Sequence, residues 1–393
     1  MENLSRDERL GLWSRVEEAA KSVEPVSGWT HQYYRYPARF STAFVREVID
    51  LFTSPGDYIL DPFVGGGTTL VEAAIRGRKS AGTDINELAH FVCKAKTTKL
   101  SSADILALCE WFKDLCDSLS MRTRVDRPVE IIEQGYQKHL QSRATWRLRK
   151  LLEIGESSVC KLPNKESRQF ARCVLLKTGQ WALDSRRDLP SVPKFRDKLK
   201  YNFAEMLAQA HELSSVRDFV EPILINRTAI GMESEHELQK LGSPKLVLTS
   251  PPYPGVYVTY HRWKVQGRLE TAAPYWLAEC KDGSGLSYYT MGHRKAKGLK
   301  SYWANIRASF GSVRKLCDPN TTVIQVVGFS DPTWQLVEYL DAMYDAGFEE
   351  VMPEVTSDDG RIWREVPGRR WYAQYQDSAR ATSQEVVLIH RPR

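Results

Sequence analysis

The sequence predicts an α/β fold with a doubly wound, mostly parallel sheet, and three observations lead to that prediction. Short apolar segments alternate with longer segments of helical periodicity, as in parallel sheets covered by helices. A glycine loop, residues 64–67, joins the first apolar segment to a helix. Another apolar segment, 245–249, ends in a serine, two prolines and a tyrosine, at a position where open sheets bind ligands.

The elements follow from periodicity and capping signals. A mixed-charge helix over 8–22 leads into an extended aromatic segment, 31–40, after which Ser41 can cap a helix ending near residue 52. Strands are expected at 58–61, 80–83, 222–226, 245–249, 322–328, 348–352 and 385–390. Further helices are expected at 68–77, 86–99, 103–119, 203–213 and 333–346.

Residues 101–218 interrupt the alternation of strands and helices. They show several helical patterns and no strand signal, so we expect an inserted helical module there. A chain of 393 residues is longer than the ~250–300 residues at which single cores stop growing, which leaves room for such a module. We therefore divide the chain into residues 1–100, the helical module 101–218, and residues 219–393.

Positive charge is concentrated in this module. The chain has a formal net charge of +6, yet residues 121–200 contain 19 Lys and Arg against 9 Asp and Glu. A basic segment beside an α/β core is typical of nucleic-acid binding, and a solvated helical surface is the alternative. The candidate phosphate contacts in the module are Arg147, Arg149, Lys150, Arg186 and Arg187.

The glycine loop has the composition of a ligand cradle. Glycines let the backbone pass close to a ligand, and the helix that follows offers free N–H groups. Asp84, at the end of the next strand, lies about 20 positions beyond the loop, where an acid holds a ribose diol. Leu70 occupies the third glycine position of a nicotinamide fingerprint, and no Gly-Lys-Ser/Thr follows, so both familiar nucleotide motifs are incomplete.

The turn at 250–253 predicts a rigid polar pocket. Each proline fixes its own φ and lacks an N–H, so the carbonyls of Ser250 and Pro251 can face a ligand. Tyr253 offers a stacking face beside them. The alternative is a strand that simply ends in a proline-rich turn.

Together these motifs resemble the DNA amino-methyltransferases, which methylate an exocyclic amine of cytosine or adenine with S-adenosylmethionine. The similarity lies in Asp61-Pro62-Phe63-Val64-Gly65-Gly66-Gly67-Thr68, in Asp84, in Thr249-Ser250-Pro251-Pro252-Tyr253, and in the aromatic segment 31–40. It covers roughly residues 30–95 and 220–393. The resemblance implies a Rossmann-like, seven-stranded methyltransferase sheet, a cofactor-binding half before the module, and a catalytic half after it.

The resemblance also assigns site residues. Asp61 and the glycine loop would hold the methionine end of S-adenosylmethionine, and Asp84 its ribose, while Phe63 could equally pack beneath the loop. The implied cofactor residues are Tyr36, Pro37, Phe40, Asp61, Pro62, Phe63, Gly65, Gly67, Thr68, Asp84 and Ile85. The implied catalytic residues are Ser250, Pro251, Pro252 and Tyr253.

The implied reaction is direct methyl transfer to a base flipped out of duplex DNA. Ser250 Oγ and the Pro251 carbonyl would accept hydrogen bonds from the amine, and Tyr253 would stack on the base. In the family, serine at the first catalytic position accompanies mainly N4-cytosine methylation, so we expect that activity, with N6-adenine methylation as the alternative. An RNA methyltransferase, a non-catalytic binding protein and a nicotinamide oxidoreductase are the rival classes.

The site of target recognition is expected in the helical module. The stretch 255–300, which mixes aromatic and basic residues, is a second candidate, and its alternative is a surface loop with a packed helix. It contributes Arg262 and Arg294 as DNA contacts, and the stretch 361–372 contributes Arg369.

Composition limits the remaining classes. The seven cysteines show no C-x-x-C pair, which argues against a disulfide framework and a zinc site. The charged start and the lack of a long apolar stretch predict a cytoplasmic protein with no membrane partner. Duplex DNA is the expected partner, and a cognate restriction endonuclease or anti-phage defence components could accompany it. The sequence predicts no metal site and leaves the recognition sequence and the oligomeric state open.

Overall fold

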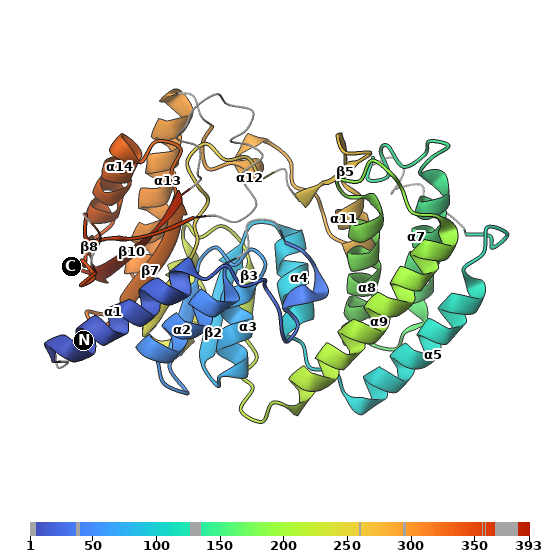
Figure 1. The fold of residues 1–393 in the computed structure, drawn as a ribbon, viewed down its shortest axis with the longest axis horizontal. Coiled ribbons are helices and arrows are strands. Elements are labelled where there is room, and N and C mark those ends of the chain that lie inside the picture. The colour runs from blue at the N-terminus through green and yellow to red at the C-terminus, as the bar shows by residue number, and fades with distance from the viewer. Residues whose placement is uncertain are drawn as a thin grey trace.

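The computed structural model describes residues 5–36, 40–125, 135–258, 261–293, 296–355, 357, 359–365 and 384–393. Its strands are β1 (Tyr58–Asp61), β2 (Lys79–Asp84), β3 (Ile223–Asn226), β4 (Leu246–Thr249), β5 (Trp263–Val265), β6 (Leu269–Thr271), β7 (Thr322–Gly328), β8 (Phe348–Glu350), β9 (Ile362–Glu365) and β10 (Gln384–Pro392). Figure 1 shows a central sheet with helices on both faces and a group of helices at one side.

Four helices precede the helical module in the chain: α1 (Arg6–Lys21), α2 (Thr42–Phe52), α3 (Thr68–Ile75) and α4 (Glu87–Thr97). The helical module contributes α5 (Ser102–Ser118), α7 (Trp146–Ser158), α8 (Lys165–Leu183) and α9 (Val192–Ser215). After it follow α10 (His236–Leu241), α11 (Ala273–Ala278), α12 (Leu286–Tyr289), α13 (Ala296–Arg314) and α14 (Pro332–Asp345). Short 3-10 helices are η1 (His31–Tyr33), η2 (Val159–Lys161) and η3 (Met232–Ser234).

The sheet confirms the predicted doubly wound fold. Its strand order is β3-β2-β1-β4-β7-β10-β8, and β9 also pairs with β10. The pairs from β3 through β7 are parallel, whereas β10 runs antiparallel to β7, as expected for the final hairpin. The seven expected positions are present, and the outermost one is shared by two short strands, because the two ends of the long β10 pair separately with β9 and β8.

Alternation along the strands explains why both faces are covered. On β4, Val247 belongs to the apolar core under α10, α13 and α14, while its neighbours Leu246 and Leu248 belong to the core under α1 and α2. Successive side chains of a strand point to opposite faces, so an apolar run of this kind requires helices on both sides. The central strands are therefore buried completely, and only their ends reach a surface.

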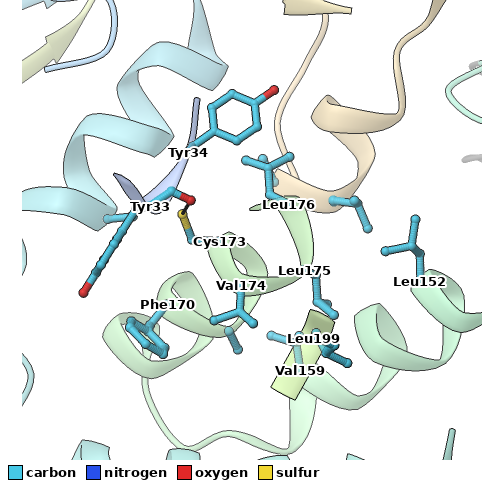
Figure 2. Close-up of a cluster of buried hydrophobic side chains, with 14 of the residues drawn as sticks. Tyr33, Tyr34, Leu152, Val159, Phe170, Cys173, Val174, Leu175, Leu176 and Leu199 are labelled. Carbon is cyan, nitrogen blue, oxygen red and sulfur yellow. Dashed lines mark hydrogen bonds between the residues drawn. The ribbon is translucent and has the colours of Figure 1, made fainter. Parts of the chain in front are cut away.

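The helical module packs around α8. This helix contacts α4, α5, α7, α9 and α11, and Figure 2 shows its apolar side chains Phe170, Val174 and Leu175 facing the interior of the module. The Phe112 and Phe203 rings stack there with centroids 3.8 Å apart. Tyr33 and Tyr34 of the aromatic segment belong to the same core, so the module is joined to the segment that precedes the sheet.

Several boundaries differ from the sequence predictions. Helix α9 begins at Val192, well before the expected residue 203, because Ser191 caps it and a proline occupies its first turn. Helices α7 and α8 are not placed by periodicity. The stretch 255–300 contains a small hairpin, β5–β6, besides its helices, and Gly179 of α8 gives the Trp263 ring of this hairpin room to pack.

Gly82 on β2 lies where the strand passes under the glycine loop. A Cβ there would come within 2.2 Å of Val64 Cγ2 and 2.6 Å of the Asp61 carbonyl oxygen. Because the Asp61 carbonyl belongs to the backbone of the paired strand and the Val64 side chain is buried, neither can move away easily, and we expect Gly82→Ala to lower the free energy of unfolding by roughly 2–4 kcal/mol. Urea denaturation followed by circular dichroism measures the change.

Gly11→Ala is the matched control, because a Cβ at this exposed position of α1 meets nothing within 4 Å. It should raise stability by up to about 1 kcal/mol through helix propensity. Equal stability of Gly82→Ala and wild type would contradict the packing described here.

Candidate functional site at the carboxyl edge of the sheet

Acids and hydroxyls meet at the carboxyl ends of β1, β2 and β4. Asp61 ends β1 and is 2% exposed, and its carboxylate accepts a hydrogen bond of 2.6 Å from Thr249 Oγ1 at the end of β4. The Phe63 N–H donates a second hydrogen bond to the same oxygen. Burial raises the pKa of Asp61 to about 6, although these hydrogen bonds oppose the shift. A carboxyl held this way is a functional candidate.

The glycine loop approaches its neighbours too closely for side chains. Gly67 has φ +78°, and a Cβ there would lie 2.5 Å from Cys93 Sγ. At Gly66 a Cβ would come within 2.9 Å of the Tyr36 side chain. The buried Lys96 donates a hydrogen bond of 2.8 Å from Nζ to the Gly66 carbonyl and so holds the loop from α4. No side chain caps α3 after the loop, so its first N–H groups can meet a ligand.

Asp84, at the end of β2, is hydrogen-bonded to the glycine loop. Its carboxylate accepts hydrogen bonds from the Gly65 N–H at 2.9 Å and the Asn86 N–H at 2.8 Å. Burial raises the pKa of Asp84 to about 6, and these two hydrogen bonds lower it in part. The next residue, Ile85, is 46% exposed. Together, Asp84 and Ile85 present an acid and an apolar surface side by side.

The turn at 250–253 follows β4 directly. Ser250 Oγ lies 3.0 Å from the Val326 carbonyl and 3.4 Å from the Tyr253 hydroxyl oxygen. Since a hydroxyl has one proton and the carbonyl is the closer acceptor, Ser250 donates to Val326 and keeps lone pairs to accept a further hydrogen bond. The Tyr302 hydroxyl donates to the Pro252 carbonyl at 2.8 Å. The turn is therefore fixed by the neighbouring strand and by α13.

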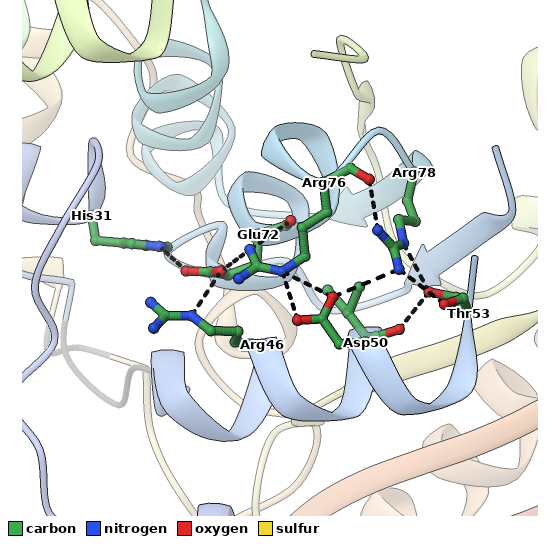
Figure 3. Close-up of polar contacts among 8 residues, drawn as sticks. His31, Arg46, Asp50, Thr53, Glu72, Arg76 and Arg78 are labelled. Carbon is green, nitrogen blue, oxygen red and sulfur yellow. Dashed lines mark hydrogen bonds and ion pairs between the residues drawn. The ribbon is translucent and has the colours of Figure 1, made fainter. Parts of the chain in front are cut away.

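The segment before the sheet is held by a buried polar cluster (Figure 3). His31 Nε2 lies 2.7 Å from Glu72 Oε1, and Arg46 and Arg76 also pair with Glu72. Burial lowers the pKa of His31, although its contact with Glu72 opposes this. For Glu72, burial would raise the pKa, but His31 and the two arginines outweigh it and lower the pKa. The cluster ties the segment to α2 and to α3, the helix after the glycine loop.

Tyr36 connects this segment to the stretch after the turn. Its hydroxyl and His261 Nε2 are 3.1 Å apart, and the two rings lie 4.7 Å apart at their centroids. Burial lowers the pKa of His261 to about 3, so the imidazole is neutral at physiological pH. Because the Tyr36 ring also lies against Gly65 and Gly66, one tyrosine joins the lead-in, the glycine loop and residue 261.

Most of the other predicted cofactor residues pack into the protein around the glycine loop. Phe40 packs on Phe44 in the core under α1 and α2, and Phe63 packs against Phe310 of α13. Pro62 accepts a hydrogen bond from Thr83 Oγ1, which holds the start of the loop. Thr68 is buried at the first position of α3. Pro37 lies outside the described residues.

One of the predicted DNA contacts needs correction. Arg149 is 6% exposed and pairs with Glu153 inside the helical module, so burial withdraws it from any phosphate. The partly buried Arg262 pairs with Asp282 at 2.6 Å and donates to the Tyr289 hydroxyl, and its predicted DNA contact stays a prediction.

The other basic candidates are distributed differently. Arg147 and Arg187 are exposed, Lys150 and Arg186 are partly buried, and the guanidinium of Arg186 lies over the Trp181 ring at 4.7 Å. Arg294 and Arg369 lie outside the described residues.

Sequence reasoning missed Glu385, Arg364, Lys96 and His261. The first two lie on β10 and β9, more than a hundred positions from the Ser250–Tyr253 turn, and no local pattern marks them. The described residues contain no cluster of three or more His, Cys, Asp or Glu that could hold a metal ion. None of the helices in the described ranges is long and apolar enough to cross a membrane.

The fold and the site define an α/β protein with a candidate ligand site at the carboxyl edge of its sheet and a polar turn beside it. Residues 5–93 match the family model described as DNA methylase, which confirms over these residues the resemblance predicted from the motifs.

Curated relatives match short parts of the chain. It is 39% identical over 79 residues to the Type II methyltransferase M.MvaI of Kocuria varians, covering 19% of this chain and 17% of that protein. It is 41% identical over 68 residues to the Type II methyltransferase M.BsoBI of Geobacillus stearothermophilus, covering 17% of this chain and 13% of that protein. For the DNA adenine methyltransferase YhdJ of Escherichia coli, identity is 38% over 55 residues, with coverage of 14% and 19%. The chain thus matches less than a fifth of the length of each of these three relatives.

Asp61 should make stability depend on pH. In the folded chain it keeps its proton up to about pH 6, whereas the unfolded chain loses it near pH 4, so its contribution to stability falls as pH rises between these values. Asp61→Asn removes this loss. We expect the variant to match wild type at pH 4 and to exceed its free energy of unfolding by up to about 3 kcal/mol at pH 8. Urea denaturation at several pH values measures the difference.

Asp114→Asn, an exposed carboxylate of α5, controls for the loss of one charge. If Asp61→Asn and wild type keep a constant difference from pH 4 to pH 8, the buried-acid interpretation is wrong.

Proposed function

We propose that this protein transfers a methyl group from S-adenosylmethionine to the exocyclic N4 amine of a cytosine flipped out of duplex DNA. The observation that carries the proposal is the hydrogen bonding of Ser250. Its proton is directed to the Val326 carbonyl, so Oγ can accept a hydrogen bond from a ligand beside the partly buried Tyr253 ring. An acceptor next to an aromatic face suits an amino group on a flat base.

The residues of the candidate cofactor site fit S-adenosylmethionine. The backbone at Gly66 and Gly67 leaves no room for side chains, and the uncapped start of α3 offers N–H groups, which suit a carboxylate. Asp61 offers a carboxylate for the α-ammonium, and Asp84 offers one for the ribose hydroxyls. Ile85 supplies apolar surface for the adenine ring. When bound, the cofactor supplies an electrophilic methyl group on a sulfonium centre.

Catalysis by these residues is a matter of orientation. The amine of a nucleobase is a poor nucleophile because its lone pair is delocalised into the ring. A hydrogen bond to Ser250 Oγ, and one to the Pro251 carbonyl, hold the two amine protons and direct the lone pair out of the base plane. Ser250 and Pro251 would thereby hold the amine in the orientation that in-line methyl transfer requires, and one amine proton would leave to water.

N6-adenine methylation is the second candidate. A hydroxyl acceptor serves an adenine amine equally well, and one relative with 38% identity over 55 residues carries the name DNA adenine methyltransferase. The cytosine assignment rests on the serine at the first position of the turn, which in the resembled family accompanies mainly cytosine methylation. We infer duplex DNA as the partner, and a cognate restriction endonuclease or an anti-phage system as the setting.

We assign target recognition to the helical module. It is joined to the segment before the sheet, because the Gln180 side chain of α8 donates to the Arg35 carbonyl and accepts from the Arg35 N–H. Arg147 and Arg187 lie on its surface, where phosphates can reach them. A module attached in this way can read DNA while the base enters the site.

Two variants separate methyl transfer from cofactor binding. Purified protein, S-adenosylmethionine and unmethylated duplex DNA should yield N4-methylcytosine by nucleoside mass spectrometry. Ser250→Ala should lower the rate about a hundredfold and leave the Kd for S-adenosylhomocysteine within twofold, because it removes only the amine acceptor. Asp84→Ala should instead raise that Kd about tenfold or more, since it removes charge-assisted hydrogen bonds to the ribose.

N6-methyladenine in this assay would move the assignment to the second candidate. Absence of any modified base on DNA of diverse sequence, with cofactor bound normally, would refute the proposed reaction.

The DNA surface is tested by salt dependence. Arg147→Ala and Arg187→Ala should each weaken duplex binding and reduce the slope of log K against log salt by about 1, because each removes a phosphate contact. Arg149→Ala should mainly destabilise the fold, since it leaves Glu153 buried without this partner. Fluorescence anisotropy over a salt series measures binding. Arg15→Ala on α1 is the control, and unchanged slopes for both module variants would refute the assignment.

A further inference from the structure

The hydroxyl of Tyr253 is held by a buried ion pair. It donates a hydrogen bond of 2.6 Å to Glu385 Oε1, and the other oxygen of Glu385 accepts one of 2.9 Å from Arg364 Nε. Glu385 is 5% exposed and Arg364 is 9% exposed. The two residues stand opposite each other on β10 and β9, so the strand pairing itself sets their geometry.

The ring of Tyr253 is also fixed from the sheet side. It lies on Gly328 at the end of β7, where a Cβ would come within 2.8 Å of Tyr253 Cε2. Gly328 stands opposite Glu385 in the antiparallel pair of β7 and β10. The glycine therefore supports one face of the ring, and the carboxylate on the next strand holds its hydroxyl. The orientation of the ring is determined by three strands that follow the turn in the sequence.

Fold stability alone is a weak reason for a buried ion pair here. Removing two charges from water is costly, and apolar residues of similar volume often give equal or greater stability. A carboxylate acceptor gives a stronger and more directional hydrogen bond than a neutral one. The neighbouring pair of Arg361 and Glu350, which is bidentate at 2.7 Å, makes no recorded contact with the turn. Of these two described pairs, the Arg364–Glu385 pair is directed at the turn.

We propose that Glu385 and Arg364 are positioning residues that hold the Tyr253 ring at the angle needed to stack on the flipped base. Glu385 acts through the Tyr253 hydroxyl, and Arg364 acts by fixing the Glu385 carboxylate. The inference rests on the proposed methyltransferase function and adds residues to the same site. It predicts that their effect on the reaction disappears when the hydroxyl is absent.

A double-mutant cycle tests this dependence. Glu385→Gln and Tyr253→Phe should each lower kcat about tenfold, while the KM for S-adenosylmethionine stays within twofold, because the cofactor residues are untouched. In the Tyr253→Phe background, Glu385→Gln should cost less than a further twofold. Glu350→Gln is the matched control, which removes one carboxylate from the neighbouring ion pair and should leave kcat within twofold.

The Glu385→Gln variant leaves Arg364 buried without this carboxylate, and it could fail to fold for that reason. The Arg364→Gln/Glu385→Gln double variant controls for this. It replaces the ion pair with two amides at facing strand positions and should also lower kcat about tenfold. Equal losses from Glu385→Gln in the wild-type and Tyr253→Phe backgrounds would overturn the proposal, as would full activity of Tyr253→Phe.

A second measurement needs neither DNA nor turnover. In protein labelled with ¹³Cζ-tyrosine, the resonance of Tyr253, assigned by its loss in Tyr253→Phe, should shift in Glu385→Gln and not in Glu350→Gln. An unchanged resonance would refute the hydrogen bond on which the inference depends. If the resonance shifts but wild-type protein methylates no DNA, the proposed function fails while the contact stands. If methylation occurs and the cycle is additive, only the positioning role fails.

Discussion

Parallel pairing of β1 with β2 on one side and β4 on the other is the constraint on which the site depends. Parallel strands end at the same edge, so Asp61, Asp84 and Ser250 come together although 166 residues separate Asp84 from Ser250 in the sequence. The pairing requires very close approach of the backbone, since Gly82 leaves no space between the strand and the Asp61 carbonyl. The hydrogen bond from Thr249 to Asp61 then joins the two halves of the site directly.

The site combines buried acids with a glycine loop, and burying the acids costs free energy. Asp61 and Asp84 lose hydration on burial, which raises the pKa of each to about 6. The hydrogen bonds they accept come largely from backbone N–H groups and a threonine, so no cation in the described contacts neutralises them as the arginines neutralise Glu72. Acids with incomplete compensation are suited to a ligand that brings its own positive charge or hydroxyl donors.

The supporting structure comes from segments far apart in the chain. Lys96 holds the glycine loop from α4, the Glu72 cluster holds α3 from the lead-in segment, and Glu385 holds Tyr253 from the last strand. Groups that must be placed within a fraction of an ångström need such second contacts, because a loop alone does not fix its side chains. The helical module is joined to the same lead-in segment, so the module and the Asp61–Asp84 side of the sheet belong to one packed structure.

The sequence by itself determined the alternation of strands and helices, the glycine loop, Asp84 and the Ser250–Tyr253 turn. These features are local, since apolar periodicity, φ requirements and proline geometry act over a few residues. Periodicity did not place α7 and α8, whose bounds come from the structure. It also could not show that Arg149 is buried while Arg147 is exposed, since that depends on which face of α7 meets α8. Only the tertiary structure decided that Glu385 and Arg364 lie behind Tyr253, because strand pairing joins residues whose separation along the chain has no local signature.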